Sequence, residues 1–476
     1  MSTEPADGTA ENPYRVSDPA DILSLIPHTL GFEPRESLVL LALCSGRLGA
    51  TLRLDLPPVR AASKAGANAA YAAAAARFLA ADTRADGALL VLYTGAPWTE
   101  PARPPFLALI RRLEKELAAV SLPVQDGWMV GPEYWRDYFC TRPGCCPWPG
   151  MPRSQITDST LNTELVYRGS AFAPSLEQAV GSSRARPWSR RQEVADAQAR
   201  FAKLLGDRWC ERDQFGGTLR LWAACFSPGV PDSGQDLAGG NPGLREAPET
   251  AGFLLASLRD RGIRDSVLVL AAVGLETALA GAEAHGLLRC QGSPAVFPRD
   301  ALGLGAGCDG TPDATALSGT GEPPGSGVAG TGARTGRART GRARTGPASP
   351  GGPIPRGAAP GQAAGYFRGI LVGRGGGTPD WPLLDRANNV FTDLAAASEG
   401  EARAALLSLL AWIEWARGRG SRAHVYLEQS LAAQPGYRLA LLLGELLGTG
   451  VLPDWARSRS ESWPGAGNDP RPGGAG

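Results

Sequence analysis

The chain has 476 residues, with 48 Lys or Arg against 47 Asp or Glu, so its formal net charge is +1. A balance this close to neutral provides no overall field that would favour nucleic acid or an acidic membrane surface. The length predicts two or three units with cores of their own, once the stretches rich in its 62 Gly and 40 Pro are set aside.

The N-terminal sequence MSTEPADGTAENPYRVSDP lacks the basic segment and apolar segment of a secretory signal peptide. The most apolar stretch, residues 266–282, is interrupted by Glu276 and is shorter than the roughly 20 residues that cross a bilayer. We therefore expect a soluble cytoplasmic protein with no membrane segment. In that compartment thiols stay reduced, which argues against disulfides.

The first 60 residues predict a helix followed by two strands. The helix has Ser17 or Asp18 as its N-cap, Pro19 in its first turn, and a stop near Gly31. The run SLVLLAL (37–43) is continuously apolar, which is typical of a strand covered on both faces. ATLRLDLP (50–57) alternates apolar and polar residues, which indicates a half-buried strand. The short connection between them predicts an antiparallel hairpin.

The next 70 residues continue the alternation of helix and strand. An Ala-rich helix over about 62–81 precedes the apolar strand GALLVLYTG (87–95). A second helix is predicted by the apolar stripe from Phe106 to Val120, and a further strand by VQDGWMV (124–130). This order is typical of an α/β layer with a mixed sheet.

The rest of the chain is mainly helical. Helical patterns occupy residues 155–290, and a low-complexity tract follows over 301–365, including the five-residue period ARTGRARTGRARTG. The tract has too few apolar side chains to offset the entropy of ordering, so we interpret it as a disordered linker rather than an Arg-rich nucleic-acid contact.

Residues 383–455 predict a C-terminal helical hairpin and a third helix. The spacing of Ala411, Ala423, Leu427 and Pro435 is similar to one tetratricopeptide-like hairpin. About three such repeats are needed for independent stability, and one and a half are visible here. These helices must therefore dock on the rest of the chain or on a protein partner.

The predicted fold class is α/β: an N-terminal mixed sheet with packed helices, a helical middle region and a C-terminal helical hairpin cap. The predicted segments are a disordered tail (1–16), the α/β domain (17–150), a mainly helical continuation of the same body (151–300), the disordered linker (301–365), the helical cap (366–456) and a second disordered tail (457–476).

Several separated motifs together resemble one known family. They are IPHTLGFEPRESLVLLAL, the RLDLP strand, the C-x4-CCP-x-x-G motif, and LLAWIEWARGRGSRAHVYLEQSLAAQPGYRLALLL near the C-terminus. In this order they resemble an uncharacterised actinobacterial family, domain of unknown function 4192. This family has no established activity, so the resemblance implies family membership but no mechanism.

The motif YFCTRPGCCPWPG (138–150) places Cys140, Cys145 and Cys146 within seven positions in a chain of eight cysteines. Thiolates bind zinc well, but a structural site takes four ligands, and this spacing supplies no second pair. A nucleophilic or redox thiolate would need a lowered pKa, for which Arg136 and Arg142 are the nearby cations. The third interpretation is a tight structural loop with small buried thiols, and this is the one we favour.

His28 and Glu33 form the second candidate site, at the end of the first helix. A histidine and a carboxylate facing a sheet are typical of general acid-base chemistry. A histidine that caps the last carbonyls of a helix gives the same pattern. Both readings remain open from the sequence.

The sequence alone leaves the function unknown. We expect a non-enzymatic partner-binding or regulatory protein, with the C-terminal helices as the surface for a protein partner, and neither a membrane nor nucleic acid as partner. The alternative is an enzyme on a small molecule, with His28, Glu33 and Cys145 or Cys146 as candidate catalytic residues in one pocket. A second alternative is a structural zinc site at the cysteine cluster. No nucleotide-binding or metalloenzyme motif occurs, so no cofactor is predicted.

Overall fold

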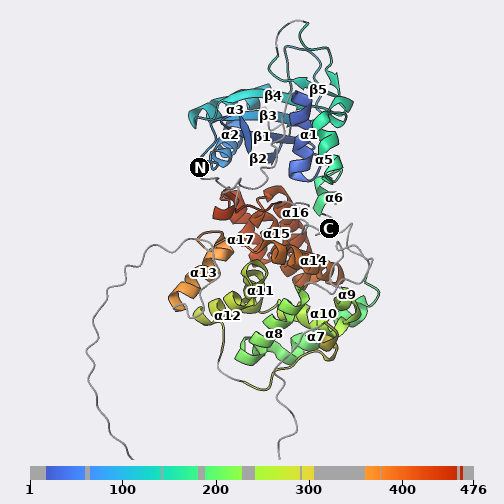
Figure 1. Cartoon of the computed structure of the whole chain (residues 1–476), viewed down its shortest axis with the longest axis vertical. Helices are drawn as coiled ribbons and strands as arrows, with labels where there is room; N and C mark the ends of the chain where they lie inside the picture. The colour runs from blue at the N-terminus through green and yellow to red at the C-terminus, as the bar shows by residue number, and fades with distance from the viewer. Residues whose placement is uncertain are drawn as a thin grey trace, which may run out of the picture.

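The computed structural model shows a sheet domain stacked on a larger helical body (Figure 1). It describes residues 18–58, 65–140, 142, 144–180, 188–227, 242–289, 292–304, 360–375, 377–457 and 461–464. Among these residues, no helix is both long and apolar enough to cross a membrane.

A mixed sheet of six strands forms the centre of the N-terminal domain, in the order β2-β1-β3-β4-β5-β6. The pair β3–β4 is parallel, and the other neighbouring pairs are antiparallel. The predicted hairpin and mixed sheet are therefore confirmed. The strands are β1 (Ser37–Cys44), β2 (Arg47–Asp55), β3 (Gly87–Tyr93), β4 (Val124–Val130), β5 (Tyr134–Asp137) and β6 (Met151–Pro152).

Helices cover both faces of this sheet, which explains why β1 and β3 are apolar along their whole length. Successive side chains of a strand point to opposite faces. Leu38 and Leu40 of β1 belong to the core with α2 and α3, while Val39 and Leu41 belong to the core with α1. The covering helices are α1 (Pro19–Leu30), α2 (Ala65–Leu79) and α3 (Leu107–Ala119).

Three short helices follow β6 and lead down to the helical body: α4 (Ser154–Thr157), α5 (Thr160–Tyr167) and α6 (Leu176–Val180). The first two pack on α1, and α6 reaches α16 of the helical body (Figure 1). Arg422 of α16 also contacts the sheet domain, because its Nη2 donates to the carbonyl of Gly31 at 3.0 Å. These contacts join the two parts of the molecule.

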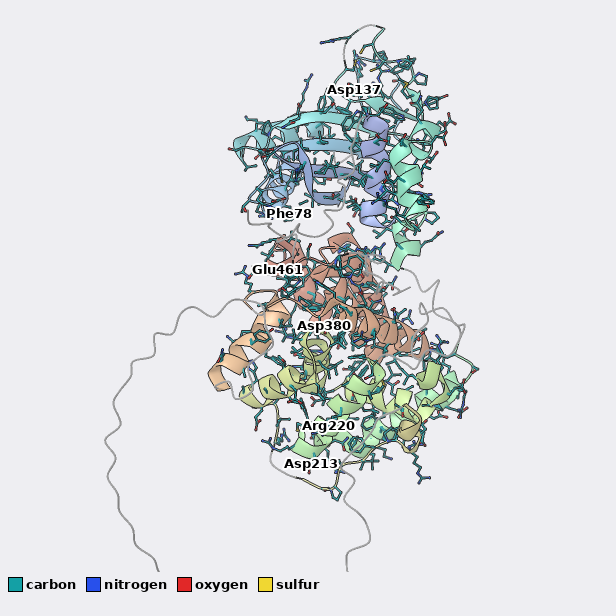
Figure 2. The ribbon with its side chains drawn as sticks, viewed as in Figure 1. Phe78, Asp137, Asp213, Arg220, Asp380 and Glu461 are labelled. Carbon is teal, nitrogen blue, oxygen red and sulfur yellow. The ribbon has the colours of Figure 1, made fainter. Side chains whose placement is uncertain are left out.

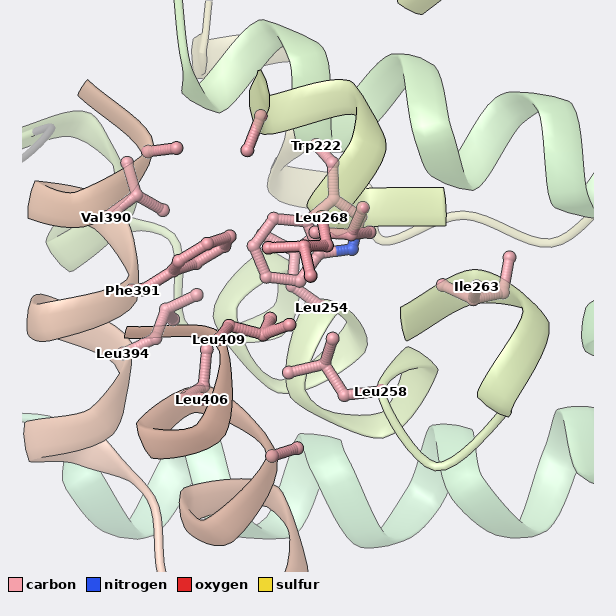
Figure 3. Packing of buried hydrophobic residues seen from close by; sticks show 14 of the residues in the cluster. Trp222, Leu254, Leu258, Ile263, Leu268, Val390, Phe391, Leu394, Leu406 and Leu409 are labelled. Carbon is pink, nitrogen blue, oxygen red and sulfur yellow. The ribbon is translucent and has the colours of Figure 1, made fainter. Parts of the chain in front are cut away.

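The helical body has one continuous apolar core that combines the middle and C-terminal regions. Figure 3 shows Trp222 and Leu254 facing Phe391 and Leu409 across this core. The Trp222 and Phe391 rings lie 5.8 Å apart. The helices are α7 (Arg191–Leu205), α8 (Arg212–Cys225), α9 (Pro242–Glu246), α10 (Pro248–Ser257), α11 (Arg261–Val273), α12 (Leu275–Ala284), α13 (Pro360–Val372), α14 (Trp381–Ala397), α15 (Gly400–Ala416), α16 (Gly420–Ala433) and α17 (Arg438–Gly448).

The division of the core differs from the one expected from the sequence. Residues 151–300 were assigned to the same body as the sheet, whereas α7–α12 share their core with α13–α17. The apolar face of the C-terminal helices is thus covered within the chain. The helices α7–α12 are the part of the chain on which the C-terminal helices dock. Partner binding through these helices and the tetratricopeptide-like description stay predictions.

The predicted disordered segments fall mostly outside the described residues, including the tail 1–16 and residues 305–359 of the linker that was predicted over 301–365. The two ends of that predicted linker are described, and they differ from the prediction: residues 301–304 belong to a 3-10 helix (Arg299–Leu304), and residues 360–365 belong to α13. Residues 461–464 of the predicted second tail are described, and here the structure differs from the prediction. The Trp463 ring lies 5.0 Å from the Arg417 guanidinium and 4.1 Å from that of Arg419. Stacking of guanidinium groups on an indole holds this segment against the helical body.

Candidate metal centre

The loop between β5 and β6 carries Cys140, Cys145 and Cys146, and the sheet holds both of its ends. β5 pairs with β6, so the chain leaves the sheet after Asp137 and returns at Met151. Figure 2 shows Asp137 at the end of the sheet domain that lies away from the helical body. The cysteines therefore lie in the loop that leaves a strand end.

Asp137 fixes the first half of this loop. Its Oδ1 accepts hydrogen bonds from the backbone N–H groups of Phe139 at 2.8 Å and Cys140 at 2.9 Å. An Asp side chain that binds backbone groups two and three residues ahead stabilises a turn. The Tyr138 hydroxyl donates to the carbonyl of Pro105 at 2.6 Å. Cys140 is thereby held at a defined position beside the end of β5.

A tight turn brings the other two cysteines back toward Cys140. The N–H of Cys145 donates to the carbonyl of Arg142 at 3.3 Å. Gly144, within this turn, has φ +73°. Glycine adopts this left-handed conformation without the steric cost that a side chain would bring. The position of Cys145 and Cys146 thus depends on a glycine in the motif.

Arg136 anchors the far side of the loop. Its side chain is buried, and Nη1 donates to the carbonyl of Pro147 at 2.9 Å. Its guanidinium carbon lies 5.3 Å from the centre of the Trp98 ring and 5.0 Å from that of Trp148. Cation–π contacts of this kind hold the Pro- and Trp-rich end of the motif on the sheet domain. Arg136 thus acts on the loop rather than directly on a thiol.

The three sulfur atoms converge. The Sγ atoms of Cys140, Cys145 and Cys146 all lie within 4.8 Å of one another. In a tetrahedral zinc site with Zn–S bonds of about 2.3 Å, sulfur atoms are separated by about 3.8 Å. A contraction of about 1 Å or less would bring all three sulfurs onto one ion.

The cysteines differ in their affinity for protons. A backbone hydrogen bond at Arg142, and then a hydrogen bond with Cys146, lower the pKa of Cys140. Burial, followed by the hydrogen bond with Cys140 and the neighbouring negative charges, raises the pKa of Cys146 to about 12. A thiolate at Cys140 that accepts a hydrogen bond from the Cys146 thiol accounts for both the lowered pKa of Cys140 and the raised pKa of Cys146. Of these two cysteines, Cys140 is therefore the one in which the thiolate, the nucleophilic and metal-binding form, is favoured.

A cavity of about 520 Å³ opens beside Cys140 and Cys145. Among the described residues, its charged lining consists of the carboxylates of Glu114, Asp126 and Asp137 and the guanidinium of Arg142. Burial raises the pKa of Glu114. Burial also raises the pKa of Asp126, to which the charge of Asp137 contributes. Carboxylates and thiolates together make this surface attractive to a cation.

Asp137 is the functional residue that the sequence reasoning missed. It lines the cavity, and its charge acts on both Cys140 and Cys146. Its carboxylate is not among the groups that converge with the three sulfurs, so it acts on the thiols through its charge and through the backbone that it holds. The available signal was an Asp at a strand end, three residues before the first cysteine, where it is suited to form a side-chain turn.

His28 lies in the last turn of α1 and bridges to the segment after β6. Its Nε2 lies 3.0 Å from Asn162 Oδ1 and its Nδ1 lies 2.9 Å from Ser170 Oγ. Asn162 directs its Nδ2 to the carbonyl of Thr157, so its oxygen faces the ring and Nε2 carries the proton. The ring also packs edge-on against Phe172 at 4.8 Å. Both ring nitrogens are thus engaged within the sheet domain.

Glu33 is also held by neighbouring groups rather than directed at the thiols. Its carboxylate forms an ion pair with Arg153, and its N–H donates to the carbonyl of Ala173 at 2.9 Å. Neither Glu33 nor His28 lines the cavity beside the cysteines. The structure brings the three cysteines together and places the histidine and glutamate elsewhere, between α1 and the segment after β6.

Comparison with known proteins gives one match. The family described as "Domain of unknown function (DUF4192)" matches residues 19–288 and 382–454. No curated protein and no solved structure matches the chain. The two matched stretches contain the whole sheet, the cysteine loop and most of the helical body. The chain belongs to the DUF4192 family.

Proposed function

We propose that the protein binds a thiophilic divalent cation, zinc in the first instance, through the Sγ atoms of Cys140, Cys145 and Cys146. The observation that carries this proposal is the convergence of three sulfurs within 4.8 Å of one another. A reducing cytoplasm would keep these thiols available for the metal.

The surroundings of the sulfurs support a metal rather than three inert thiols. Arg136 and Asp137 hold the loop that carries the sulfurs. The adjoining cavity is lined mainly by carboxylates among its charged groups, so the field there favours a cation. A bound ion would replace the proton of the Cys146 thiol, because only the thiolate is a ligand.

The donor set also suggests the kind of site. Three cysteines leave one position of a tetrahedral ion, which a molecule in the cavity would occupy. Closed four-ligand sites are structural, whereas three protein ligands with an open position are typical of zinc that binds small molecules or water. The proposed centre is therefore an accessible one.

The proposal is tested by titrating Co²⁺ into the reduced, chelator-treated full-length protein. We expect thiolate-to-cobalt charge-transfer absorption that saturates at one ion per chain, and displacement by Zn²⁺. Cys146→Ser should weaken binding at least about tenfold, because one strong ligand is lost. Cys210→Ser is the matched control, since Cys210 bonds to the carbonyl of Asp207 and lies outside the loop. The proposal would be overturned if the charge-transfer absorption were absent, or if wild type and Cys146→Ser bound Co²⁺ with the same affinity.

A further inference from the structure

A second cavity lies in the helical body, at the junction of the middle and C-terminal helices. Its volume is about 230 Å³. The turn between α10 and α11 forms one wall, and the loop between α16 and α17 forms the opposite wall. Sites for drug-sized ligands typically measure about 300–1,000 Å³, so this cavity is suited to a small group rather than to a whole large ligand.

Four arginines line this cavity: Arg259, Arg261, Arg264 and Arg438. The acidic groups beside them are Glu401, 3.7 Å from Arg259, and Asp265, 2.6 Å from Arg264. Among the residues that the structure describes, Arg261 and Arg438 have no ion-pair partner. The residues that line the cavity carry four positive charges and one negative charge, and the carboxylates of Asp260 and Asp265 lie next to them in the segment at the start of α11.

Arg264 and Tyr437 form a fixed floor for the cavity. The side chain of Arg264 is 11% exposed, and its Nη1 donates to the Tyr437 hydroxyl at 3.2 Å. Burial raises the pKa of Tyr437, although Arg264 opposes this, so the phenol stays protonated at neutral pH. Its hydroxyl hydrogen is thus free to donate to a ligand while its oxygen accepts from Arg264. The two exposed arginines, Arg261 and Arg438, stand above this floor on opposite walls.

Two helices begin at the cavity walls. α11 begins at Arg261, and α17 begins at Arg438. The N-cap of α17 is Tyr437, whose side chain forms no capping hydrogen bond. The start of α11 is capped by Asp260, whose Oδ1 accepts from the N–H of Ile263 at 2.9 Å, whereas the start of α17 adds partial positive charge and backbone donors to the field of the guanidinium groups. The planar donor geometry of arginine matches the oxygens of phosphate better than those of a spherical anion.

We propose that this cavity binds the phosphate group of a small phosphorylated molecule, with Arg261 and Arg438 as its contacts from opposite walls. Arg264 and the Tyr437 hydroxyl would contact the group from below. The rest of the molecule would lie outside the cavity, over the α16–α17 loop. The site is separate from the cysteine loop, so this proposal does not depend on metal binding.

The test uses the full-length protein and isothermal titration with inorganic phosphate and diphosphate, at an ionic strength held constant with NaCl. We expect saturable binding at one site, tighter for diphosphate. Arg261→Gln and Arg438→Gln should each weaken it about tenfold or more, because each removes a charged hydrogen-bond donor. Arg261→Lys should retain part of the affinity, since it keeps the charge and loses the planar contact.

Two controls separate this site from general electrostatics. Arg112→Gln removes an arginine of α3 that pairs with Glu116 at 2.6 Å, and it should leave the affinity unchanged. Cys146→Ser should also bind diphosphate as the wild type does, which distinguishes this proposal from the metal proposal. The inference would be overturned by unsaturable binding, by equal affinity of wild type and the Arg261→Gln/Arg438→Gln double variant, or by an equal loss in Arg112→Gln. A short single-stranded DNA that displaces diphosphate with higher affinity would contradict the assignment to a small molecule.

Discussion

Asp137 shows how one side chain can serve both the fold and the proposed chemistry. Its Oδ1 holds the backbone of Phe139 and Cys140, and its charge acts on two of the three thiols. The hydrogen bonds fix where Cys140 lies, while the negative charge favours a cation beside it. Substitutions at this position can separate the two contributions.

We expect Asp137→Ala to lower metal affinity about 10- to 100-fold, as is usual when a group that orients ligands is removed. Asp137→Asn retains an oxygen that can accept the two backbone hydrogen bonds and loses only the charge. The metal affinity of Asp137→Asn, measured by competition with a chromophoric chelator, should therefore lie between that of the wild type and that of Asp137→Ala. An Asn variant as weak as the Ala variant would show that the charge outweighs the positioning.

At the scale of the elements, α1 is fastened to the segment after β6 by His28 and Glu33. His28 reaches Asn162 and Ser170, and Glu33 pairs with Arg153. These contacts tie residues 153–173 to the sheet. The arrangement accounts for a histidine and a glutamate near a helix end without a catalytic role.

His28→Ala should lower the free energy of unfolding by about 1–3 kcal/mol, because Asn162 and Ser170 each lose a partly buried partner. It should leave metal stoichiometry unchanged, because His28 does not line the cavity beside the cysteines. His424→Ala is the control, since that side chain is 61% exposed and should change stability by less than about 0.5 kcal/mol. Loss of metal in His28→Ala would instead support one shared pocket.

The elements of the sheet domain were largely predictable because their signals are local. The apolar run at 37–43 and the alternation at 50–57 each indicate which faces of a strand are covered, and both strands are present.

For the cysteine cluster, the sequence predicts the location of the loop but not the convergence of the sulfur atoms. Its place after a strand follows from the sequence, but the convergence of three sulfurs depends on hydrogen bonds that the backbone N–H groups of Cys140 and Cys145 donate to Asp137 Oδ1 and to the carbonyl of Arg142, and spacing alone does not reveal them. The prediction that His28 and the thiols share one pocket was wrong for a similar reason. The sequence does not show which helix packs beside which loop, because this depends on the fold of the whole domain.

At the scale of the whole molecule, the helices are grouped by shared core rather than by sequence order. Phe391 of α14 packs against Trp222 of α8 and against Phe226, which directly follows that helix, across the long segment that separates them in sequence. Apolar stripes identify helices but not their partners, so the sequence could not show that the middle helices leave the sheet domain and join the C-terminal ones. This grouping places the arginine-lined cavity at the junction.

A buried charge cluster lies where the helical body meets the sheet domain. Glu414 pairs with Arg417 at 2.5 Å, and Arg422 reaches the carbonyl of Gly31. Burial acts to raise the pKa of Glu414, but Arg417, Arg419 and Arg422 outweigh it and hold that pKa below its ordinary value. The cluster therefore favours the charged carboxylate in the folded protein.

Because the folded pKa of Glu414 is lowered, its contribution to stability is present above the unfolded value of about 4.3 and is lost as pH falls below it. Glu414→Gln should lower the free energy of unfolding at pH 7 by about 1–3 kcal/mol, since the buried Arg417 loses one of its two carboxylate partners and keeps Asp385. The difference from wild type should shrink toward pH 3 in denaturant titrations. Glu428→Gln, at a side chain 67% exposed, is the control that should change little. A difference independent of pH would contradict this account.

The most direct test of the central claim is the metal content of the full-length protein, purified under reducing conditions without chelator and measured by elemental analysis. We expect close to one zinc per chain in the wild type and in Cys210→Ser, and a large loss in Cys140→Ser and Cys146→Ser. The same amount of metal in wild type and in both cysteine-loop variants, or a wild type that takes up no zinc on reconstitution, would contradict it.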